Sequence, residues 1–171
     1  MIMKKIVIIN SSPRINGNCD ILCSEFGRGA VMNEGNEVSR IDLKDIEYDF
    51  YREEQKLDEL DNIAHQLIDA DVIVLGTPVY FYNMSGMMKT LIDRMMPYFT
   101  QIADKDFYFI LTAAVNKKEM EATAESLQGF TDSLPNANLV RVFYGNNVSQ
   151  KGDVLDRSVY KEVFEAASKI F

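Results

Sequence analysis

Cysteine, histidine and long apolar runs are scarce in this chain. Its 171 residues include two cysteines and one histidine. No apolar stretch approaches the ~20 residues that a membrane-spanning helix requires. The short apolar run at residues 6–9 leads directly into polar residues, so a signal peptide's h-region and cleavage site are missing. We therefore expect a cytoplasmic protein with no membrane partner.

The few cysteines and the single histidine leave little material for a metal site. Cys19 and Cys23 are four residues apart, which places them on one face of a helix but matches neither a Cys-x-x-Cys pair nor a zinc knuckle. We interpret Cys23 as a small core residue. Cys19 falls in a first helical turn, where a thiol's pKa can drop, although a structural role is favoured. We expect His65 to lie on the surface without chemistry, and we predict no metal.

Basic residues are also fewer than acidic ones. Lys and Arg number 18 against 26 Asp and Glu, which gives a formal net charge of −8. This balance argues against a general affinity for nucleic acid or anionic membranes, but not against a local anion site. The length predicts one domain over residues 1–171.

What the chain does contain is a regular alternation of short apolar strands and amphipathic helices. This pattern is typical of βαβ units, and it predicts an α/β fold in which helices cover both faces of a parallel sheet. A polar loop after the first strand favours a three-layer, flavodoxin-like sandwich of strand order 2-1-3-4-5, with a ligand at the carboxyl ends of strands one and three. We expect strands at 3–9, 37–42, 71–76, 107–114 and 138–144, and helices at 18–33, 57–69, 85–96, 117–133 and 153–170.

The polar loop reads NSSPRINGN, residues 10–18. Asn18 is a natural N-cap for the helix that follows, and the unpaired N–H groups of a helix start favour an anion such as phosphate. The loop matches neither a Walker A motif nor the Gly-x-Gly-x-x-Gly turn. The alternative is a well-capped βα connection without a ligand. The candidate phosphate donors are Ser11, Ser12, Arg14, Asn16 and Asn18.

The loop after the third strand faces the same ligand if the switch-point rule holds. It reads GTPVYFYNMSG, residues 76–86, with three consecutive aromatic residues. Tyr80, Phe81 or Tyr82 could stack on a flat ring system. Alternatively, these side chains fill space against the next helix or contact another subunit. A phosphoacceptor receiver domain is excluded, because strand one lacks terminal acidic residues and strand three does not end in aspartate.

Both loops resemble those of the NAD(P)H-dependent FMN reductase and iron–sulfur flavoprotein group of the flavodoxin-like superfamily. The phosphate loop supplies one motif, and TPVYF, followed by MSG and IDR, supplies the other about sixty residues later. The resemblance covers most of the chain and weakens after the fourth strand.

The resemblance implies FMN as the cofactor and NADH or NADPH as the hydride donor. It implies that Ser11, Arg14, Asn16 and Asn18 hold the 5′-phosphate and that residues 78–84 line the isoalloxazine. The loop after strand four, residues 112–114, and the turn after strand five, residues 145–147, would close the other side. The acceptor would be a small molecule such as a quinone, nitro or azo compound. Such an exchange needs no dedicated acid or base, so we predict no catalytic residue. The full set of expected cofactor-binding residues is Ser11, Ser12, Arg14, Asn16, Asn18, Cys19, Pro78, Val79, Tyr80, Phe81, Asn83, Met84, Ser85, Thr112, Ala113 and Gly145.

The chain departs from the group's pattern in two places. Cys19 stands where the group usually has Thr or Ser, and a thiol is a poorer donor to a phosphate. The acidic and aromatic segment 43–56 lacks the cysteine cluster of iron–sulfur members, so we predict no cluster there. This segment either covers the flavin, contacts a second subunit, or is a solvated loop. We expect most of the broad methionine-rich face of helix 85–96 to be core and its excess breadth to contact another subunit. The resemblance implies frequent dimers, so we expect a homodimer or homotetramer.

Two other functions remain open. A flavodoxin-type carrier would pass single electrons between proteins without oxidising NAD(P)H, and an acidic surface suits a basic partner. Its phosphate loop is typically rich in Thr and Ser, unlike the loop here. The third alternative is a flavin-free descendant that binds other proteins.

Overall fold

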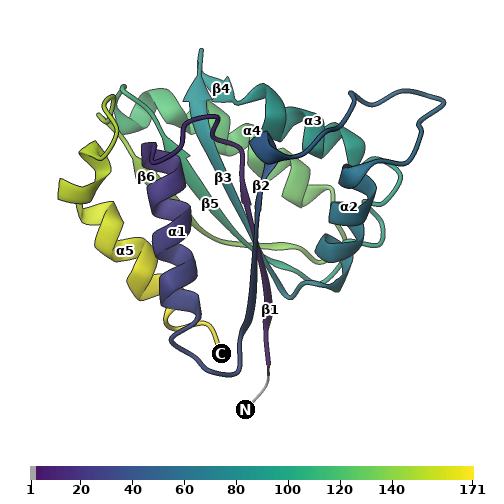
Figure 1. The fold of residues 1–171 in the computed structure, drawn as a ribbon, viewed down its shortest axis with the longest axis horizontal. Helices are drawn as coiled ribbons and strands as arrows, with labels where there is room; N and C mark the ends of the chain where they lie inside the picture. Colours follow the sequence, from purple (N-terminus) through teal and green to yellow (C-terminus); the bar gives the residue numbers. More distant parts are fainter. Residues whose placement is uncertain (1–2) are drawn as a thin grey trace.

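The computed structural model describes residues 3–171 and shows a parallel sheet of five strands (Figure 1). The strand order is β2-β1-β3-β5-β6, which is the predicted 2-1-3-4-5 order because β4 is a short extra strand that pairs antiparallel with β3. The flavodoxin-like fold is therefore confirmed. The strands are β1 Lys5–Asn10, β2 Glu37–Asp42, β3 Val72–Tyr80, β4 Asn83–Met84, β5 Asp106–Thr112 and β6 Asn138–Gly145.

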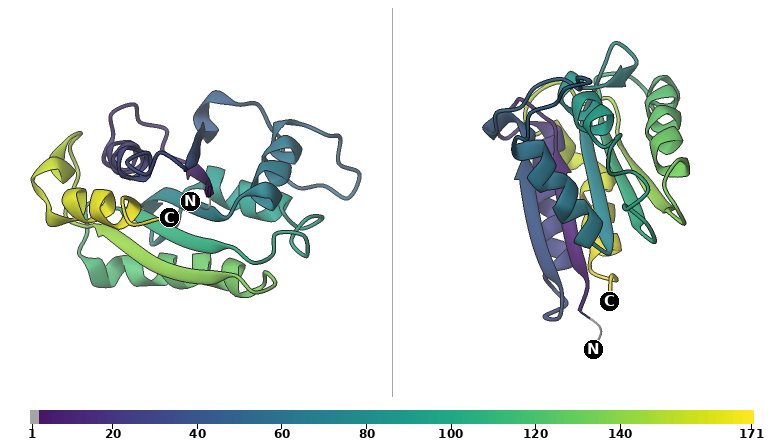
Figure 2. Two further views of the ribbon diagram at one scale, coloured as in Figure 1. Left: turned by 90° about the horizontal axis from the view of Figure 1, so that it is seen from below. Right: turned by 90° about the vertical axis from the view of Figure 1, so that its right-hand side faces the viewer.

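Helices cover both faces of this sheet, as Figure 2 shows in two further views. One layer holds α1 and α5, and the other holds α2, α3 and α4. The helices are α1 Asn18–Ala30, α2 Glu59–Asp69, α3 Gly86–Arg94, α4 Glu121–Asp132 and α5 Ser158–Ala167, with 3-10 turns at Leu43–Asp45, Lys117–Met120 and Asp153–Asp156. Among the described residues no helix combines the length and apolarity needed to cross a membrane.

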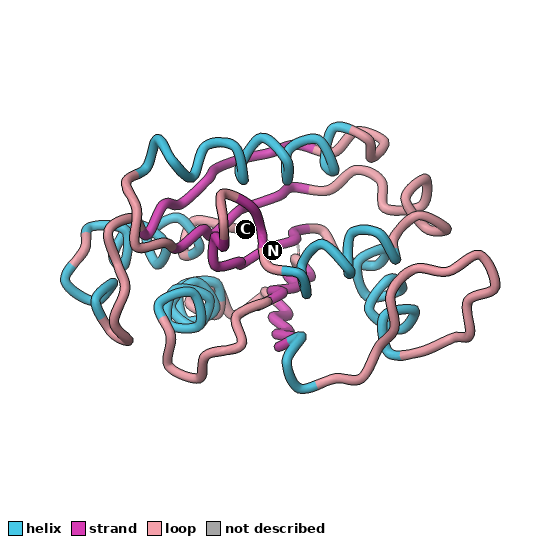
Figure 3. Tube along the Cα trace, turned by 90° about the horizontal axis from the view of Figure 1, so that it is seen from above, coloured by secondary structure: helices cyan, strands magenta, loops and turns pink. Residues whose placement is uncertain are grey.

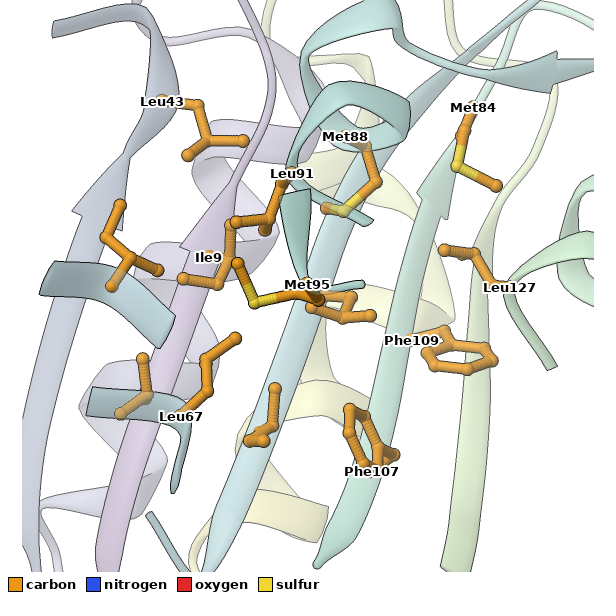
Figure 4. Packing of buried hydrophobic residues seen from close by; sticks show 14 of the residues in the cluster. Ile9, Leu43, Leu67, Met84, Met88, Leu91, Met95, Phe107, Phe109 and Leu127 are labelled. Atoms are coloured by element: carbon orange, nitrogen blue, oxygen red, sulfur yellow. The ribbon is translucent and has the colours of Figure 1, made fainter. Parts of the chain in front are cut away.

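Strand β1 shows why the two faces form separate cores. Its side chains alternate between the faces of the sheet, so Ile6 and Ile8 pack with α1 and α5 while Val7 and Ile9 pack with the other three helices. Figure 4 shows the second core, where Ile9 lies beside Leu91 of α3 and Leu127 of α4 lies near Phe109 of β5. Burial on both faces explains the continuous apolar character of the central strands.

The carboxyl ends of the parallel strands lie together at one edge of the sheet, at the top of Figure 1. Figure 3 looks down on this edge, where the connecting loops meet above the strands. The first described residues, before β1, and the C-terminal end lie at the opposite edge (Figure 1). Every loop predicted to contact a ligand therefore belongs to the edge seen in Figure 3.

Several expected boundaries were wrong. Helix α2 begins at Glu59 because Asp58 forms a capping box with Asp61, which leaves Leu57 exposed instead of on the apolar face. Helix α1 ends at Ala30, and α3 ends at Arg94, two residues before the expected Met96. The expected helices at 117–133 and 153–170 each divide into a 3-10 turn and an α-helix. The last deviation, the extension of β3, shapes the site.

Candidate functional site

A cavity of about 230 Å³ opens at the carboxyl edge of the sheet. Its walls come from the loop after β1 with the start of α1, from the end of β3, and from the loops after β5 and β6. This is the place that the switch-point rule predicts for a ligand. The lining residues are Ser12, Arg14, Gly17, Asn18, Cys19, Pro78, Val79, Tyr80, Thr112, Ala113, Ala114, Val148 and Ser149.

The start of α1 offers unpaired N–H groups to this cavity. Gly17 is the N-cap residue, so the expectation that Asn18 caps the helix was wrong. The first bond of the helix runs from the N–H of Ile21 to the carbonyl of Gly17. Among the described residues, the N–H groups of Asn18 and Cys19 have no acceptor, and both residues line the cavity. Such groups, together with the helix dipole, favour an anion.

The side chains of Asn18 and Arg14 connect the start of α1 and the loop before it with the segment after β6. The side-chain amide of Asn18 donates to the carbonyl of Gln150 at 2.9 Å and accepts from the N–H of Val154 at 3.2 Å. Arg14 donates one guanidinium N–H to the carbonyl of Ser149 at 3.0 Å. The remaining N–H groups of this exposed guanidinium are available to an anion.

The loop residues Ser11 and Asn16 do not line the cavity. The hydroxyl of Ser11 is fully buried, donates to the carbonyl of Gly76 at 3.0 Å and accepts from the hydroxyl of Ser85 at 2.8 Å. Ser85 in turn caps α3 by accepting from the N–H of Met88. Asn16 adopts a φ of 55° and donates its N–H to the carboxylate of Asp20. In this structure both residues shape the loop.

Strand β3 extends to Tyr80 and turns back through a two-residue hairpin into β4, where a loop was expected. The hairpin residues Phe81 and Tyr82 have φ of 50° and 65°, the pattern of a type I′ turn. Bulky residues rarely adopt this conformation, and such strain often marks a functional site. Phe81 is 99% exposed and Tyr82 is 62% exposed. Thus two of the three aromatic rings project from the cavity rim instead of filling the core.

Tyr80 lies at the end of β3 and lines the cavity directly. Partial burial raises the pKa of its phenol, and this effect outweighs the opposing influence of Arg14. The phenol therefore stays neutral at physiological pH. Pro78 and Val79, which precede Tyr80 on β3, line the cavity with it.

The loops after β5 and β6 are joined by backbone hydrogen bonds. The N–H of Ala113 donates to the carbonyl of Gly145, and the N–H of Val148 donates to the carbonyl of Ala113. Gly145 does not line the cavity. A Cβ at this position would lie 3.0 Å from Thr112, so the glycine allows the two loops to pack closely. This close approach lets the two loops form one continuous wall.

Cys19 lines the cavity, and its thiol is buried in the core that α1 and α5 form with the sheet. The thiol is a weak donor to the side-chain oxygen of Asn10 at 3.5 Å. The neighbouring Cys23 thiol and burial together raise the Cys19 pKa well above its ordinary value. The possibility of a reactive Cys19 is therefore not supported, and both cysteines are free and buried.

The acidic segment 43–56 contributes nothing to the cavity wall. The buried guanidinium of Arg94 holds the end of this connection by donating to the carboxylate of Asp58 and to the carbonyl of Asp49. The long loop consequently projects beside α2 and α3, at the right of Figures 1 and 3. The segment does not cover this cavity.

Nine of the sixteen expected residues line the cavity: Ser12, Arg14, Asn18, Cys19, Pro78, Val79, Tyr80, Thr112 and Ala113. The other seven lie beside it or at its rim: Ser11, Asn16, Phe81, Asn83, Met84, Ser85 and Gly145. Met84 packs in the core with Leu127, and Asn83 pairs with Tyr80 across the hairpin. Four lining residues are outside this set: Gly17, Ala114, Val148 and Ser149. Ala114 belongs to the loop after β5 that was expected to close the site, whereas the other three were not assigned to it. Gly17 lies within the expected phosphate loop, whereas no local motif marks Val148 or Ser149.

The fold is flavodoxin-like, and its cavity opens at the first βα loop. A model of the NADPH-dependent FMN reductase family matches residues 4–146, so the chain belongs to this family. An iron–sulfur flavoprotein of Methanocaldococcus jannaschii is 37% identical over 102 residues, which are 54% of this chain and 52% of that protein. The chain spans about half the length of the curated relatives it matches.

Solved structures share the whole fold at low sequence identity. An azoreductase from Bacillus anthracis superposes with a TM-score of 0.76 at 16% identity, covering 98% of this chain and all of that one. An FMN-dependent NADH-azoreductase from Bacillus anthracis, solved in complex with FMN, gives a TM-score of 0.73 at 17% identity, covering 96% and 98%. At these identities the similarity establishes the fold alone.

Proposed function

We propose that this protein binds FMN and uses it to oxidise NADH or NADPH, passing the electrons to a small-molecule acceptor. The observation that carries the proposal is a single cavity with two kinds of lining. Unpaired N–H groups at the start of α1 and the guanidinium of Arg14 form one part, and Tyr80 at the end of β3 contributes to another. The first feature suits a phosphate, and the second suits a flat ring system. Membership of the FMN reductase family supports the same assignment.

The residues present fit an FMN phosphate. The N–H groups of Asn18 and Cys19 and the guanidinium of Arg14 would bind it. Ser12 adds a hydroxyl whose oxygen accepts from the N–H of Arg14 at 3.2 Å, which leaves its proton free to donate. Since the thiol of Cys19 is buried and donates to Asn10, the backbone N–H at this position would replace the hydroxyl that the family usually has there.

The ring system would lie between the end of β3 and the loops after β5 and β6. Pro78, Val79 and Tyr80 would contact one side, and Thr112 and Ala113 would contact the other. When bound, FMN supplies the redox chemistry by taking a hydride from NAD(P)H and passing electrons to a quinone, nitro or azo compound. The exposed rings of Phe81 and Tyr82 would orient a second flat substrate over the site. We assign no side chain as a catalytic acid or base.

We further propose that this chain carries no iron–sulfur cluster, although several relatives are named iron–sulfur flavoproteins. Such clusters are held by four ligands, usually cysteine thiolates. The two cysteines here lie buried in α1 and serve packing.

We also propose that the chain forms a homodimer or homotetramer. An apolar groove of about 360 Å³ lies between α3 and α4, and its lining includes the exposed side chains of Met96 and Phe99. Light scattering should give the mass of an oligomer for the wild type and a lower mass for Met96→Lys. Met32→Lys alters an equally exposed methionine outside the groove and should not change the mass. A monomeric wild type would overturn this part of the proposal.

The test of function is anaerobic titration of the FMN-reconstituted protein with NADH and NADPH. Rapid loss of oxidised-flavin absorbance with either nucleotide is the expected result. Bound FMN that resists both nucleotides yet accepts electrons from a chemical reductant would instead identify a flavodoxin-type carrier.

A further inference from the structure

Arg40, on β2, joins two carboxylates at the edge of the sheet that holds the cavity. Its Nη2 contacts Asp20 on α1 and also donates to Asp42 at 2.6 Å, while its Nε donates to the other oxygen of Asp42 at 3.1 Å. Its Nη1 donates to the hydroxyl of Ser24. Arg40 lines no part of the cavity. The guanidinium thus connects β2 with the first turn of α1.

Each of these carboxylates is hydrogen-bonded further into the phosphate loop. Asp20 accepts the backbone N–H of Asn16 at 2.7 Å. Asp42 accepts the side-chain amide of Asn10 at 2.6 Å, and the amide oxygen of Asn10 accepts the N–H of Ser12 at 3.2 Å. Two chains of hydrogen bonds therefore lead from Arg40 to the loop that contacts the cavity.

The charges in this network matter because Asp20 and Asp42 are anions beside a site for another anion. Burial alone would lower the pKa of Arg40, but its bonds to Asp42 and Asp20 outweigh burial and raise it. Burial would likewise raise the pKa of Asp42, and hydrogen bonds from Arg40 and Asn10 lower it instead. Lys44 also interacts electrostatically with Asp42 and Asp20, but its ion-pair partner is Asp45 at 2.6 Å. Arg40 is the cation that forms ion pairs with both carboxylates.

We propose that Arg40 is a positioning residue for the phosphate of FMN: it neutralises Asp20 and Asp42 and thereby holds the phosphate loop ready for a dianion. This inference rests on the proposed FMN function. A lysine would keep the charge but lacks the planar fork that spans two carboxylates. The role predicts discrimination between FMN and riboflavin, which differ by the phosphate alone.

The test compares FMN and riboflavin affinities of the wild type, Arg40→Met and Arg40→Lys by quenching of flavin fluorescence. Removing one cation beside two carboxylates should weaken FMN binding about tenfold, the size of a unit-charge change near a dianion in a partly screened site. Riboflavin affinity should change by no more than about twofold, because riboflavin has no phosphate for the unpaired carboxylates of Asp20 and Asp42 to repel. Arg40→Lys should lose less FMN affinity than Arg40→Met.

Two further variants separate this role from a merely structural one. Arg141→Met removes one positive charge from β6, where Arg141 is the exposed partner of Glu162 on α5. This variant should leave both affinities unchanged. Asp20→Asn combined with Arg40→Met removes one uncompensated anion and should recover part of the FMN affinity, even if Arg40→Met alone is too unstable to measure.

The possible results are distinct. If FMN and riboflavin binding weaken together in Arg40→Met, or if neither changes, the positioning role is overturned. If the wild type binds no FMN, the proposed function itself fails, whatever the variants do.

Discussion

The side-chain oxygen of Asn18 accepts a hydrogen bond of 3.2 Å from the backbone N–H of Val154, 136 residues later in the chain. The amide nitrogen of the same side chain donates to the carbonyl of Gln150. Both partners follow β6, whereas Asn18 is the first residue of α1. This one side chain therefore fixes the distance between two walls of the cavity.

Replacing Asn18 with Ala should lower both stability and FMN affinity. The change removes two hydrogen bonds and leaves a buried N–H and a carbonyl to find other partners, at a cost of about 1–3 kcal/mol in the free energy of unfolding. FMN should bind more weakly because the wall around Ser149 loses its anchor. Urea unfolding and an FMN titration would measure both effects. Asn62→Ala, at an exposed position on α2, is the control, and equal behaviour of the two variants would contradict the anchoring role.

Replacing Gly76 with Ala should destabilise the protein, because the added methyl group would overpack the space between β3 and α1. A Cβ at this position would lie 2.3 Å from the sulfur of Cys23 and 3.3 Å from that of Cys19. Overpacking of this kind costs about 1–3 kcal/mol, which thermal or urea unfolding can detect. Gly129→Ala is the matched control, because its Cβ would meet nothing within 4 Å and Ala favours the α4 helix. A Gly76→Ala variant as stable as the wild type would refute the packing argument.

The sheet order and the position of the ligand edge could be predicted from the sequence. Buried parallel strands such as β1 read as uninterrupted apolar runs, and a polar loop after the first strand marks the switch point. The hairpin between β3 and β4 was missed because Phe81 and Tyr82 replace the Asn-Gly pair that usually signals such a turn. The tertiary structure overrides local preference there.

Long-range contacts explain the remaining differences at the site. Asn18 is an ordinary N-cap by local rules, but its side chain bonds to residues after β6 while Gly17 takes the cap position. Ser149 enters the cavity wall through a bond from Arg14 across 135 residues. No local pattern encodes such contacts. The loop that lines the cavity could therefore be predicted from the sequence, but the contacts that each of its residues makes could not.

Arg94 should be far more important for stability than a surface ion pair on the same helix. Its side chain is 1% exposed and pairs with Asp58 and Asp61 at 2.5 Å and 2.9 Å. Arg94→Met leaves these carboxylates without a cation and should cost about 3–5 kcal/mol. Lys89→Met removes an exposed pair with Asp93 and should cost about 1 kcal/mol or less. Equal losses in urea unfolding would contradict this assignment.

The same cluster should make stability depend on acid pH. Burial would raise the pKa of Asp58, but bonds from Arg94 and from backbone N–H groups outweigh it and lower the pKa below the ordinary 3.8. A lowered folded-state pKa means that the stabilisation is fully present above 3.8 and is lost as the pH falls through the lowered value. Urea unfolding between neutral pH and about pH 2 should show this loss in the wild type and a smaller loss in Asp58→Asn. Identical pH profiles would exclude Asp58 as the source.

The strained hairpin between β3 and β4 should lower the stability of the protein while its exposed rings increase activity. Phe81→Asn combined with Tyr82→Gly places preferred residues at both positive φ positions and should relieve about 1–3 kcal/mol of strain, which raises the melting temperature. The double variant should also oxidise NAD(P)H more slowly at low substrate concentration, because the exposed rings that orient the second substrate are gone. Phe50→Asn removes an exposed aromatic ring outside the site and should change neither property. A faster or unchanged double variant would refute the role of these rings.

Binding of FMN is the central claim, and the visible absorption spectrum of the protein after incubation with FMN and desalting tests it most directly. The account predicts retained bands of oxidised flavin at about one FMN per chain. It also predicts that Cys19→Ala retains FMN as the wild type does, since the thiol is buried against Asn10 and the proposed phosphate contact is the backbone N–H. A wild-type protein that emerges from desalting without flavin would contradict the account.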